Sequence, residues 1–252
     1  MALMNDNKKT HFGYKSVDPE DKTDLVGEVF TSVAHKYDLM NDLMSLGMHR
    51  LWKKVAIDIL NLKKGQKVLD LATGSADLAR LMAKKVGAQG SVVATDINPS
   101  MLQQGIDKSL NQGMAENLQF QLANAEALDF EDNSFDAVTI GFGLRNVTHK
   151  EKALQEIHRV LKITGKLLIL EFSEVKAPLA KKLYDAYSFQ VIPKIGKWVA
   201  NDEASYQYLA ESIRVHPNQD LLKQMLEDAG FSNCYFYNMS LGVVAIHVGY
   251  KL

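Results

Sequence analysis

Short apolar runs alternate with amphipathic segments through the middle of the chain. The runs have the length of strands, and the segments between them carry apolar residues at helical spacing. The expected strands are 68–71, 91–95, 118–122, 135–140 and 166–172, and the expected helices are 75–86, 99–112 and 150–161. Strands separated by helices predict a parallel sheet with helices on both faces, as in doubly wound α/β domains.

The C-terminal part of the chain breaks this alternation. Residues 233–238 and 243–250 have the pattern of two strands joined by a turn at 239–242. Because this connection is too short for a crossover helix, the two strands must be antiparallel. A mostly parallel, seven-stranded sheet closed by an antiparallel hairpin is the outline of class I methyltransferases dependent on S-adenosylmethionine (AdoMet), which have a Rossmann-like fold. Dinucleotide dehydrogenases more often continue with parallel strands.

Two stretches outside the alternation are helical in pattern, residues 25–60 and residues 178–215. The second stretch is interrupted at Pro193 and Gly196, which are both weak helix formers. We expect a single methyltransferase domain over residues 25–252, in which the two stretches form a helical lid over the substrate.

The bulk properties are those of an ordinary globular protein. The 252 residues carry a formal net charge of −1 with scattered lysines, so nucleic acid is not expected as a partner. Cys234 is the single cysteine, which excludes an intrachain disulfide and favours a reducing compartment. Residues 1–24 are polar, lack the apolar core of a signal sequence, and are predicted to form a flexible N-terminal tail. No run reaches the roughly 20 apolar residues of a membrane-spanning helix, and we expect a cytoplasmic protein.

The loop after the first strand of the alternation has the pattern of a nucleoside site. Asp70 ends the strand, and Gly74 and Ser75 follow in a loop of small residues that lets a ligand approach the backbone. Asp96 ends the next strand, 22 residues after Gly74, where a carboxylate accepts from ribose hydroxyls. Because the loop is not Gly-x-Gly-x-x-Gly, a ligand without a pyrophosphate is favoured, and AdoMet is the natural candidate.

Two further loops follow strands of the same sheet. Asn124 and Ala125 come after the third strand, where Asn124 can donate to and accept from an adenine edge. Gly141, Arg145 and Asn146 come after the fourth strand, at the carboxyl edge where open α/β sheets bind ligands. We expect Gly141 to allow close approach of the ligand, and Arg145 and Asn146 to face the reacting centre. The seven histidines lack the paired spacing of a zinc site, so no metal is predicted.

Several longer motifs resemble the ubiquinone/menaquinone biosynthesis C-methyltransferases. The resemblance runs from about residue 24 to Leu252 and is carried by the runs Lys36–Asp42, Gly141–Val147, Tyr184–Phe189, Ala204–Leu209 and Ser212–Pro217. It implies AdoMet-dependent C-methylation of a polyprenylated benzoquinol, of demethylmenaquinol, or of both. It also implies contact with the inner face of the membrane and with other quinone-biosynthesis proteins, and it leaves a homodimer open.

The resemblance also implies roles for single residues. By matching position, AdoMet contacts fall at Ser75, Asp96, Asn124, Ala125 and Gly141, and the catalytic group near the quinol falls at Arg145 and Asn146, with Tyr37 nearby. Relatives usually have more glycine in the first loop, with threonine at position 75, and many have serine at position 141.

A quinol ring carbon becomes nucleophilic when its ortho hydroxyl loses a proton. We expect cationic Arg145 to stabilise the resulting anion, with Asn146 orienting it. The proton acceptor stays open among water, His35, Asp38, His49 and Tyr37.

Other functions stay open at this point. The fold is equally compatible with O- or N-methylation of another small molecule. A nicotinamide-dependent oxidoreductase is disfavoured by the terminal hairpin and by the missing third glycine. A non-catalytic member of a quinone-synthesis complex is compatible with the altered loops.

Overall fold

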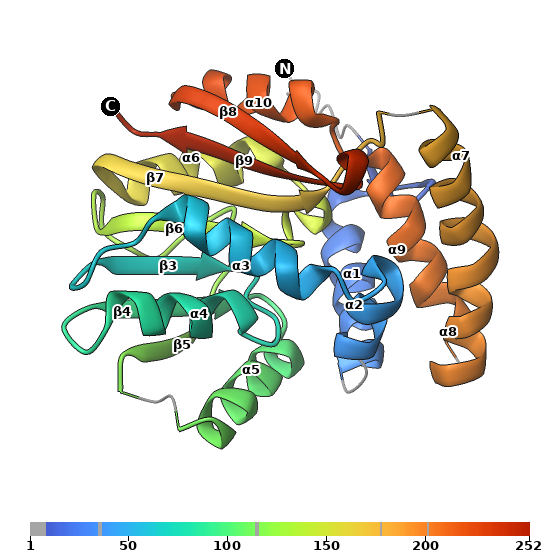
Figure 1. Ribbon diagram of the computed structural model, residues 1–252, viewed down its shortest axis with the longest axis horizontal. Helices are drawn as coiled ribbons and strands as arrows, with labels where there is room; N and C mark the ends of the chain where they lie inside the picture. The colour runs from blue at the N-terminus through green and yellow to red at the C-terminus, as the bar shows by residue number, and fades with distance from the viewer. Residues whose placement is uncertain (1–8, 35–36, 114–115, 177, 201) are drawn as a thin grey trace, which may run out of the picture.

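The structure, a computed structural model, describes residues 9–34, 37–113, 116–176, 178–200 and 202–252. Its centre is a seven-stranded sheet of order β5-β4-β3-β6-β7-β9-β8 (Figure 1). The strands are β3 (Lys67–Leu71), β4 (Ser91–Asp96), β5 (Leu118–Leu122), β6 (Phe135–Gly141), β7 (Leu161–Phe172), β8 (Ser232–Met239) and β9 (Val244–Tyr250). Strand β9 runs opposite to the other six strands of this sheet, so it is antiparallel to both β7 and β8. The predicted parallel sheet with an antiparallel C-terminal hairpin is therefore confirmed.

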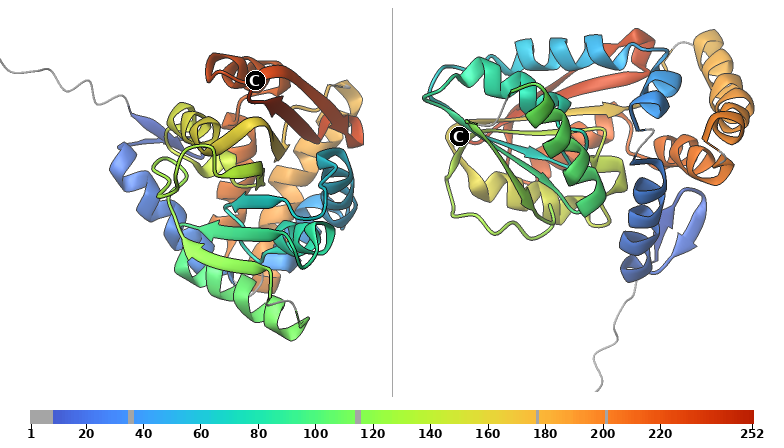
Figure 2. Two further views of the ribbon diagram at one scale, coloured as in Figure 1. Left: turned by 90° about the vertical axis from the view of Figure 1, so that its left-hand side faces the viewer. Right: turned by 90° about the horizontal axis from the view of Figure 1, so that it is seen from below.

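Helices cover both faces of the sheet because its central strands are apolar on both sides. In β7, Leu168 and Leu170 belong to one core cluster, and Leu167 and Ile169 belong to the other. The first cluster includes residues of α3 (His49–Leu60) and α4 (Asp77–Val86), and the second includes residues of α6 (Lys150–Val160) and α10 (Gln219–Asp228). Helix α5 (Pro99–Asn111) contacts β4 and β5 at one edge of the sheet (Figure 2).

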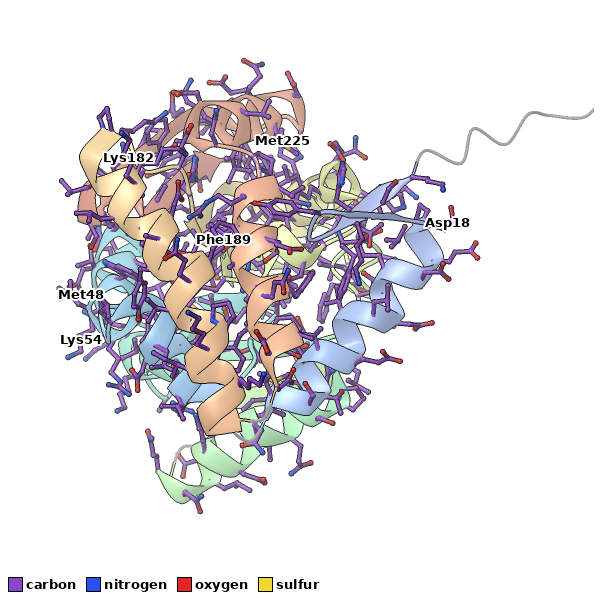
Figure 3. The ribbon with its side chains drawn as sticks, turned by 90° about the vertical axis from the view of Figure 1, so that its right-hand side faces the viewer. Asp18, Met48, Lys54, Lys182, Phe189 and Met225 are labelled. Carbon is purple, nitrogen blue, oxygen red and sulfur yellow. The ribbon has the colours of Figure 1, made fainter. Side chains whose placement is uncertain are left out.

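A layer of helices lies across the carboxyl edge of the parallel strands (Figure 1). Its members are α1 (Pro19–Val33), α2 (Tyr37–Ser45), α7 (Pro178–Ala186), α8 (Ile192–Ala200) and α9 (Glu203–Val215). Figure 3 shows α9 between α1 and the α7–α8 pair, with Phe189 close to α9. Helices α1 and α2 of the first predicted lid stretch therefore meet α7, α8 and α9 of the second over one end of the sheet. Residues 49–60 of the first stretch instead form α3, which packs on a face of the sheet.

The N-terminal region differs from the prediction. A flexible tail over residues 1–24 is wrong for residues 10–24, and residues 1–8 lie outside the described part of the chain. Strands β1 (Thr10–Phe12) and β2 (Lys15–Val17) form a hairpin, and α1 begins at Pro19. The Phe12 ring stacks on Tyr208 of α9 with ring centroids 4.2 Å apart, so an aromatic contact anchors the hairpin.

The second predicted lid stretch is also more continuous than expected. A π-helical segment, Tyr187–Val191, joins α7 to α8, and Pro193 is accommodated as the second residue of α8. Gly196 lies inside α8, where a Cβ atom would come within 2.4 Å of the Tyr206 ring. The glycine is therefore required for the close packing of α8 on α9 and does not end the helix.

Candidate functional site

The main pocket lies where the carboxyl ends of β3, β4, β5 and β6 meet the helical layer. Its volume is about 100 Å³, and it is partly open to solvent. Helix α1 forms one wall of the pocket. The structure brings five of the predicted site residues to its lining: Gly74, Asp96, Asn124, Ala125 and Asn146.

Asp96 is the buried acid of this pocket. Its Oδ2 atom accepts from the Gly74 amide and its Oδ1 atom accepts from the Asn98 amide, both at 2.9 Å. Burial raises the pKa of the Asp96 carboxyl, and these amide donors partly oppose the shift. The carboxylate thus positions the loop of small residues, and its remaining lone pairs are available to a ligand hydroxyl.

The loop after β3 is held in an unusual backbone conformation. Ala72, Gly74 and Ala76 all have positive φ angles, of 50°, 53° and 60°. This region favours glycine, because a Cβ atom there crowds the following carbonyl oxygen at a cost of roughly 1–2 kcal/mol. The two alanines therefore store strain beside the pocket.

Replacing Ala72 with glycine is expected to raise the free energy of unfolding by about 0.5–1 kcal/mol, because relief of strain exceeds the added entropy of the unfolded chain. The Ala72 side chain is half-buried, so little packing is lost. Ala76→Gly is the matched control, since its methyl group is fully buried and its loss offsets the relief. Urea unfolding of both variants measures the difference, and a less stable Ala72→Gly protein would contradict the strain.

A mainly apolar slot lies beside Asp96 in the same pocket. Val26, Phe30 and Met101 line the pocket together with Ala125.

Asn124 differs in one respect from the prediction that its side chain both donates and accepts at a base edge. Its Oδ1 atom accepts from the Glu126 amide at 2.9 Å. The Asn124 amino group is therefore the part of the side chain that can donate to a ligand.

Three other predicted residues line a neighbouring hollow. Asp70, Ser75 and Gly141 lie there with Lys53 and Asp77, and Ala72 and Phe142 separate this hollow from the main pocket by lining both. Lys53 is buried and its Nζ atom donates to Asp77 at 2.7 Å. Sequence reasoning missed Lys53, because a lone lysine on an amphipathic helix carries no distinguishing pattern.

Asp70 is fully enclosed in this hollow. It accepts from the hydroxyls of Thr73 at 2.6 Å and Thr139 at 2.5 Å. Burial raises the pKa of the Asp70 carboxyl to about 6, against the lowering effect of these donors and of Lys53. In this structure Asp70 therefore braces the end of β3, and its neighbours fill its acceptor sites.

Ser75 and Gly141 lie opposite each other in the same hollow. The Ser75 hydroxyl donates to Asp38 of α2 at 3.3 Å, and Asp38 also forms an ion pair with Lys108 of α5. At Gly141, a Cβ atom would lie 2.5 Å from a terminal methyl group of Leu78. A serine at position 141 therefore requires the end of the Leu78 side chain to shift.

Arg145 and Asn146 diverge although they are neighbours in sequence. The Arg145 guanidinium forms a buried ion pair with Glu171 at 3.0 Å and donates to the Phe142 carbonyl. It lines a second cavity beside the main pocket. Asn146 lines the main pocket, and its Oδ1 atom accepts from the Tyr208 hydroxyl at 2.9 Å. The catalytic roles of both residues remain predictions.

The other predicted groups near the reacting centre are placed only in part. Tyr37 opens α2, but its side chain lies outside the described part of the structure, as does His35. His49 is buried and contacts Asp42 at 2.8 Å, which leaves it engaged within the helical layer. Tyr208, which orients Asn146, was missed by sequence reasoning although it lies in the quoted run Ala204–Leu209.

The arrangement fits a nucleoside that carries a flat base. Asp96 supplies a buried acceptor for sugar hydroxyls, and the apolar slot beside it accommodates a ring. No group of three side chains suited to holding a metal ion occurs among the residues that the structure describes. The chemistry of the site therefore depends on hydrogen bonds, charge and shape.

Comparisons with known proteins agree with this geometry. The model of the "ubiE/COQ5 methyltransferase family" matches residues 17–251. The ubiquinone/menaquinone biosynthesis C-methyltransferase UbiE of Legionella pneumophila (strain Paris) is 55% identical over 249 residues, covering 99% of this chain and 100% of the relative. The enzyme of the same name from Escherichia fergusonii is 57% identical over 242 residues, 96% of each chain.

Solved structures show the same fold at low sequence identity. A SAM-dependent methyltransferase from Aquifex aeolicus has a TM-score of 0.62 at 19% identity and covers 85% of this chain and 98% of its own. A putative S-adenosyl-L-methionine-dependent methyltransferase from Methanococcus maripaludis has a TM-score of 0.63 at 17% identity and covers 88% and 93%. The predicted methyltransferase fold is confirmed.

Proposed function

This chain belongs to the ubiE/COQ5 methyltransferase family, and from that premise we propose how its residues methylate a quinol. The resemblance noted in the sequence is confirmed. The protein is an AdoMet-dependent C-methyltransferase of ubiquinone/menaquinone biosynthesis. The assignment of roles to single residues, the choice of quinol and the contact with a membrane are proposals.

The observation that carries the proposal is the buried Asp96 carboxylate beside an apolar slot. We assign the ribose hydroxyls of AdoMet to Asp96 and the adenine to the slot that includes Ala125, with the Asn124 amino group donating to the base. The methionine moiety is assigned to the loop at Gly74 and to the neighbouring hollow at Ser75. AdoMet supplies a methyl group that its sulfonium already activates.

Asn146 is proposed to contact the acceptor oxygen. Because its Oδ1 atom is occupied by the Tyr208 hydroxyl, its amino group is left to donate into the pocket. Such a donor stabilises negative charge on a quinol oxygen, which increases electron density at the adjacent ring carbon. Burial raises the pKa of Tyr208 well above its usual value, so this tyrosine remains a hydrogen-bond donor.

Tyr208→Phe is expected to lower kcat about fivefold and to leave the KM for AdoMet nearly unchanged. The variant keeps the stacking on Phe12 but removes the hydrogen bond that orients Asn146, a bond worth about 1 kcal/mol. Steady-state kinetics with AdoMet as the varied substrate measures the two constants. Tyr237→Phe, at a half-exposed tyrosine, is the control. An unchanged kcat in Tyr208→Phe would show that Tyr208 does not position Asn146 for the reaction.

The polyprenyl tail of the quinol needs an apolar environment outside the sheet. None of the described helices is long and apolar enough to cross a membrane. We propose that the helical layer holds the tail and contacts a membrane surface at the α2–α3 connection, where Leu46, Met48 and Leu51 are exposed by 74%, 38% and 50%. Leu46→Asp with Leu51→Asp should reduce co-flotation with vesicles while AdoMet binding is retained.

The choice of acceptor is tested by assaying the purified protein with labelled AdoMet. The two acceptors are a polyprenyl benzoquinol and demethylmenaquinol, and mass analysis of the product locates the methyl group. Methyl transfer to a ring carbon of one or both quinols is expected. Transfer to oxygen would instead favour an O-methyltransferase.

A further inference from the structure

A second cavity of about 320 Å³ adjoins the main pocket and shares Thr148 with it. It lies between the β1–β2 hairpin, α1, the start of α6 and the α9–α10 connection. Arg145 lines this cavity, whereas Asn146 lines the main pocket. The proposed methyl transfer assigns no ligand to this space.

Cationic side chains converge on the cavity. Lys22 and Lys150 both line it, and their Nζ atoms donate to the same carbonyl oxygen of Val147, at 3.2 and 3.0 Å. Lys22 is only 3% exposed. In the described part of the chain, no carboxylate lies within 4.0 Å of either ammonium group. Two like charges, of buried Lys22 and half-buried Lys150, therefore lie side by side without an ion-pair partner among the described residues, which is an unfavourable arrangement.

The carboxylates nearest to these cations are already engaged or lie at the surface. Glu171 is paired with Arg145, and Glu126 accepts from the amides of Thr148 and His149. Glu151 lines the cavity but is exposed. Burial and the neighbouring Lys150 charge lower the pKa of Lys22 to about 8, and burial lowers that of Lys150. The interior of the cavity thus has an excess of positive charge.

Buried hydrogen-bonding atoms without a partner belong to residues that line the same cavity. His216 lines the cavity and is 9% exposed, and both of its ring nitrogens are buried without a partner among the described residues. The Arg145 Nε atom is also buried without a hydrogen-bond partner among the described residues. Burial, with the charges of Lys150 and Arg145, lowers the pKa of His216 far below its usual value. A neutral histidine and a free guanidinium N–H can both donate to an oxyanion.

We propose that this cavity is an anion-binding site that takes an oxyanion of the phosphate class through Lys22, Lys150, Arg145 and His216. The anion neutralises the two ammonium groups and accepts from the imidazole and from the guanidinium. The same chemistry is offered by free phosphate and by a lipid headgroup, and exposed Val215 and Leu221 flank the opening. Arg145 is shared with the predicted stabilisation of the quinol anion, whereas Lys22, Lys150 and His216 have no part in it.

Binding of radiolabelled inorganic phosphate to the full chain tests the proposal. Equilibrium dialysis is carried out with saturating S-adenosylhomocysteine, so that the main pocket is blocked. We expect one phosphate per chain, and at least tenfold weaker binding by Lys22→Gln and by Lys150→Gln. Lys54→Gln makes the same charge change at an exposed lysine, which lies on the opposite side of the view in Figure 3 from Asp18, and should bind normally.

A second measurement uses the unmodified protein, so that it does not depend on the folding of a variant. The imidazole NMR signals of His216 should shift as phosphate is added, while those of His49 stay constant. Phosphate that binds without moving the His216 signals, or that binds equally well to Lys22→Gln, would overturn the proposal.

Vesicles separate the two sources of phosphate. Co-flotation with phosphatidylglycerol vesicles, lost in Lys22→Gln but kept in Lys54→Gln, identifies a lipid headgroup. Phosphate binding in dialysis without such flotation identifies a free anion. Failure of the native chain to bind phosphate and to associate with the vesicles through Lys22 would reject the site, whatever the outcome of the quinol assay.

Discussion

Replacing Asp96 with alanine is expected to weaken AdoMet binding by about a hundredfold or more. The buried carboxylate is the acceptor assigned to the ribose hydroxyls, and hydrogen bonds to a charged group are worth roughly 1.5–3 kcal/mol each. The same change leaves the Gly74 and Asn98 amides without their acceptor, so the loop also loses its anchor. Calorimetric titration with S-adenosylhomocysteine measures the affinity of the folded variant.

Asp96→Asn gives a finer test of the same carboxylate. Each carboxylate oxygen accepts from a different backbone amide, whereas an asparagine has a single oxygen and would direct its amino group at one of these donors. Asp96→Asn should therefore weaken AdoMet binding nearly as much as Asp96→Ala, although asparagine is almost the same size as aspartate. Asp129→Ala, at an exposed acid, is the control. A folded Asp96→Ala protein of normal affinity would remove Asp96 from the binding site.

Arg145→Met is expected to lower the free energy of unfolding by about 3–5 kcal/mol, because it leaves the Glu171 carboxylate buried and unpaired. Both side chains are at most 2% exposed, so water cannot replace the lost partner. Urea unfolding measures the loss. The double variant Arg145→Met with Glu171→Leu removes both charges and should recover most of the stability.

Two variants of the Arg145–Glu171 pair distinguish a structural role of Arg145 from a catalytic one. Arg145→Lys keeps the positive charge beside Glu171 but loses the fixed fork of donors. If the charge stabilises the ionised quinol, Arg145→Lys should retain far more activity than the stable double variant. Equal activities of these two proteins would show that Arg145 acts only by supporting the fold.

The parallel part of the sheet is predictable because its signal is local. Apolar runs predict β3, β4, β5 and β6 to within one residue at each end. Both faces of β3, β4 and β6 are buried, whereas β5 is a mostly exposed edge strand. The β1–β2 hairpin escapes prediction because its strands have three residues each and are stabilised by a distant ring on α9. The helix predicted to reach residue 161 ends at Val160, and β7 begins at the next residue, Leu161.

The site is predictable only where position on the sheet decides function. Asp96 and Asn124 follow strand ends, so strand order alone brings them to one edge. The partners of Arg145 and Asn146 cannot be inferred in this way. Glu171 and Tyr208 are separated from them by 26 and 62 residues, and their contacts depend on the register of β6 against β7 and on the path of α9. Lys22 lies in the stretch predicted to be a flexible tail.

Helix α2 is fastened at both of its ends. Asp38 holds the Ser75 hydroxyl beside the cofactor loop, and the Leu43 carbonyl accepts from Tyr187 in the π-helical segment. A ligand that accepts a hydrogen bond from the Ser75 hydroxyl breaks the contact with Asp38 and leaves the contact between Leu43 and Tyr187 in place. Because Asp38 also pairs with Lys108 of α5, α2 stays attached to the sheet side of the site when the Ser75 hydroxyl turns to a ligand.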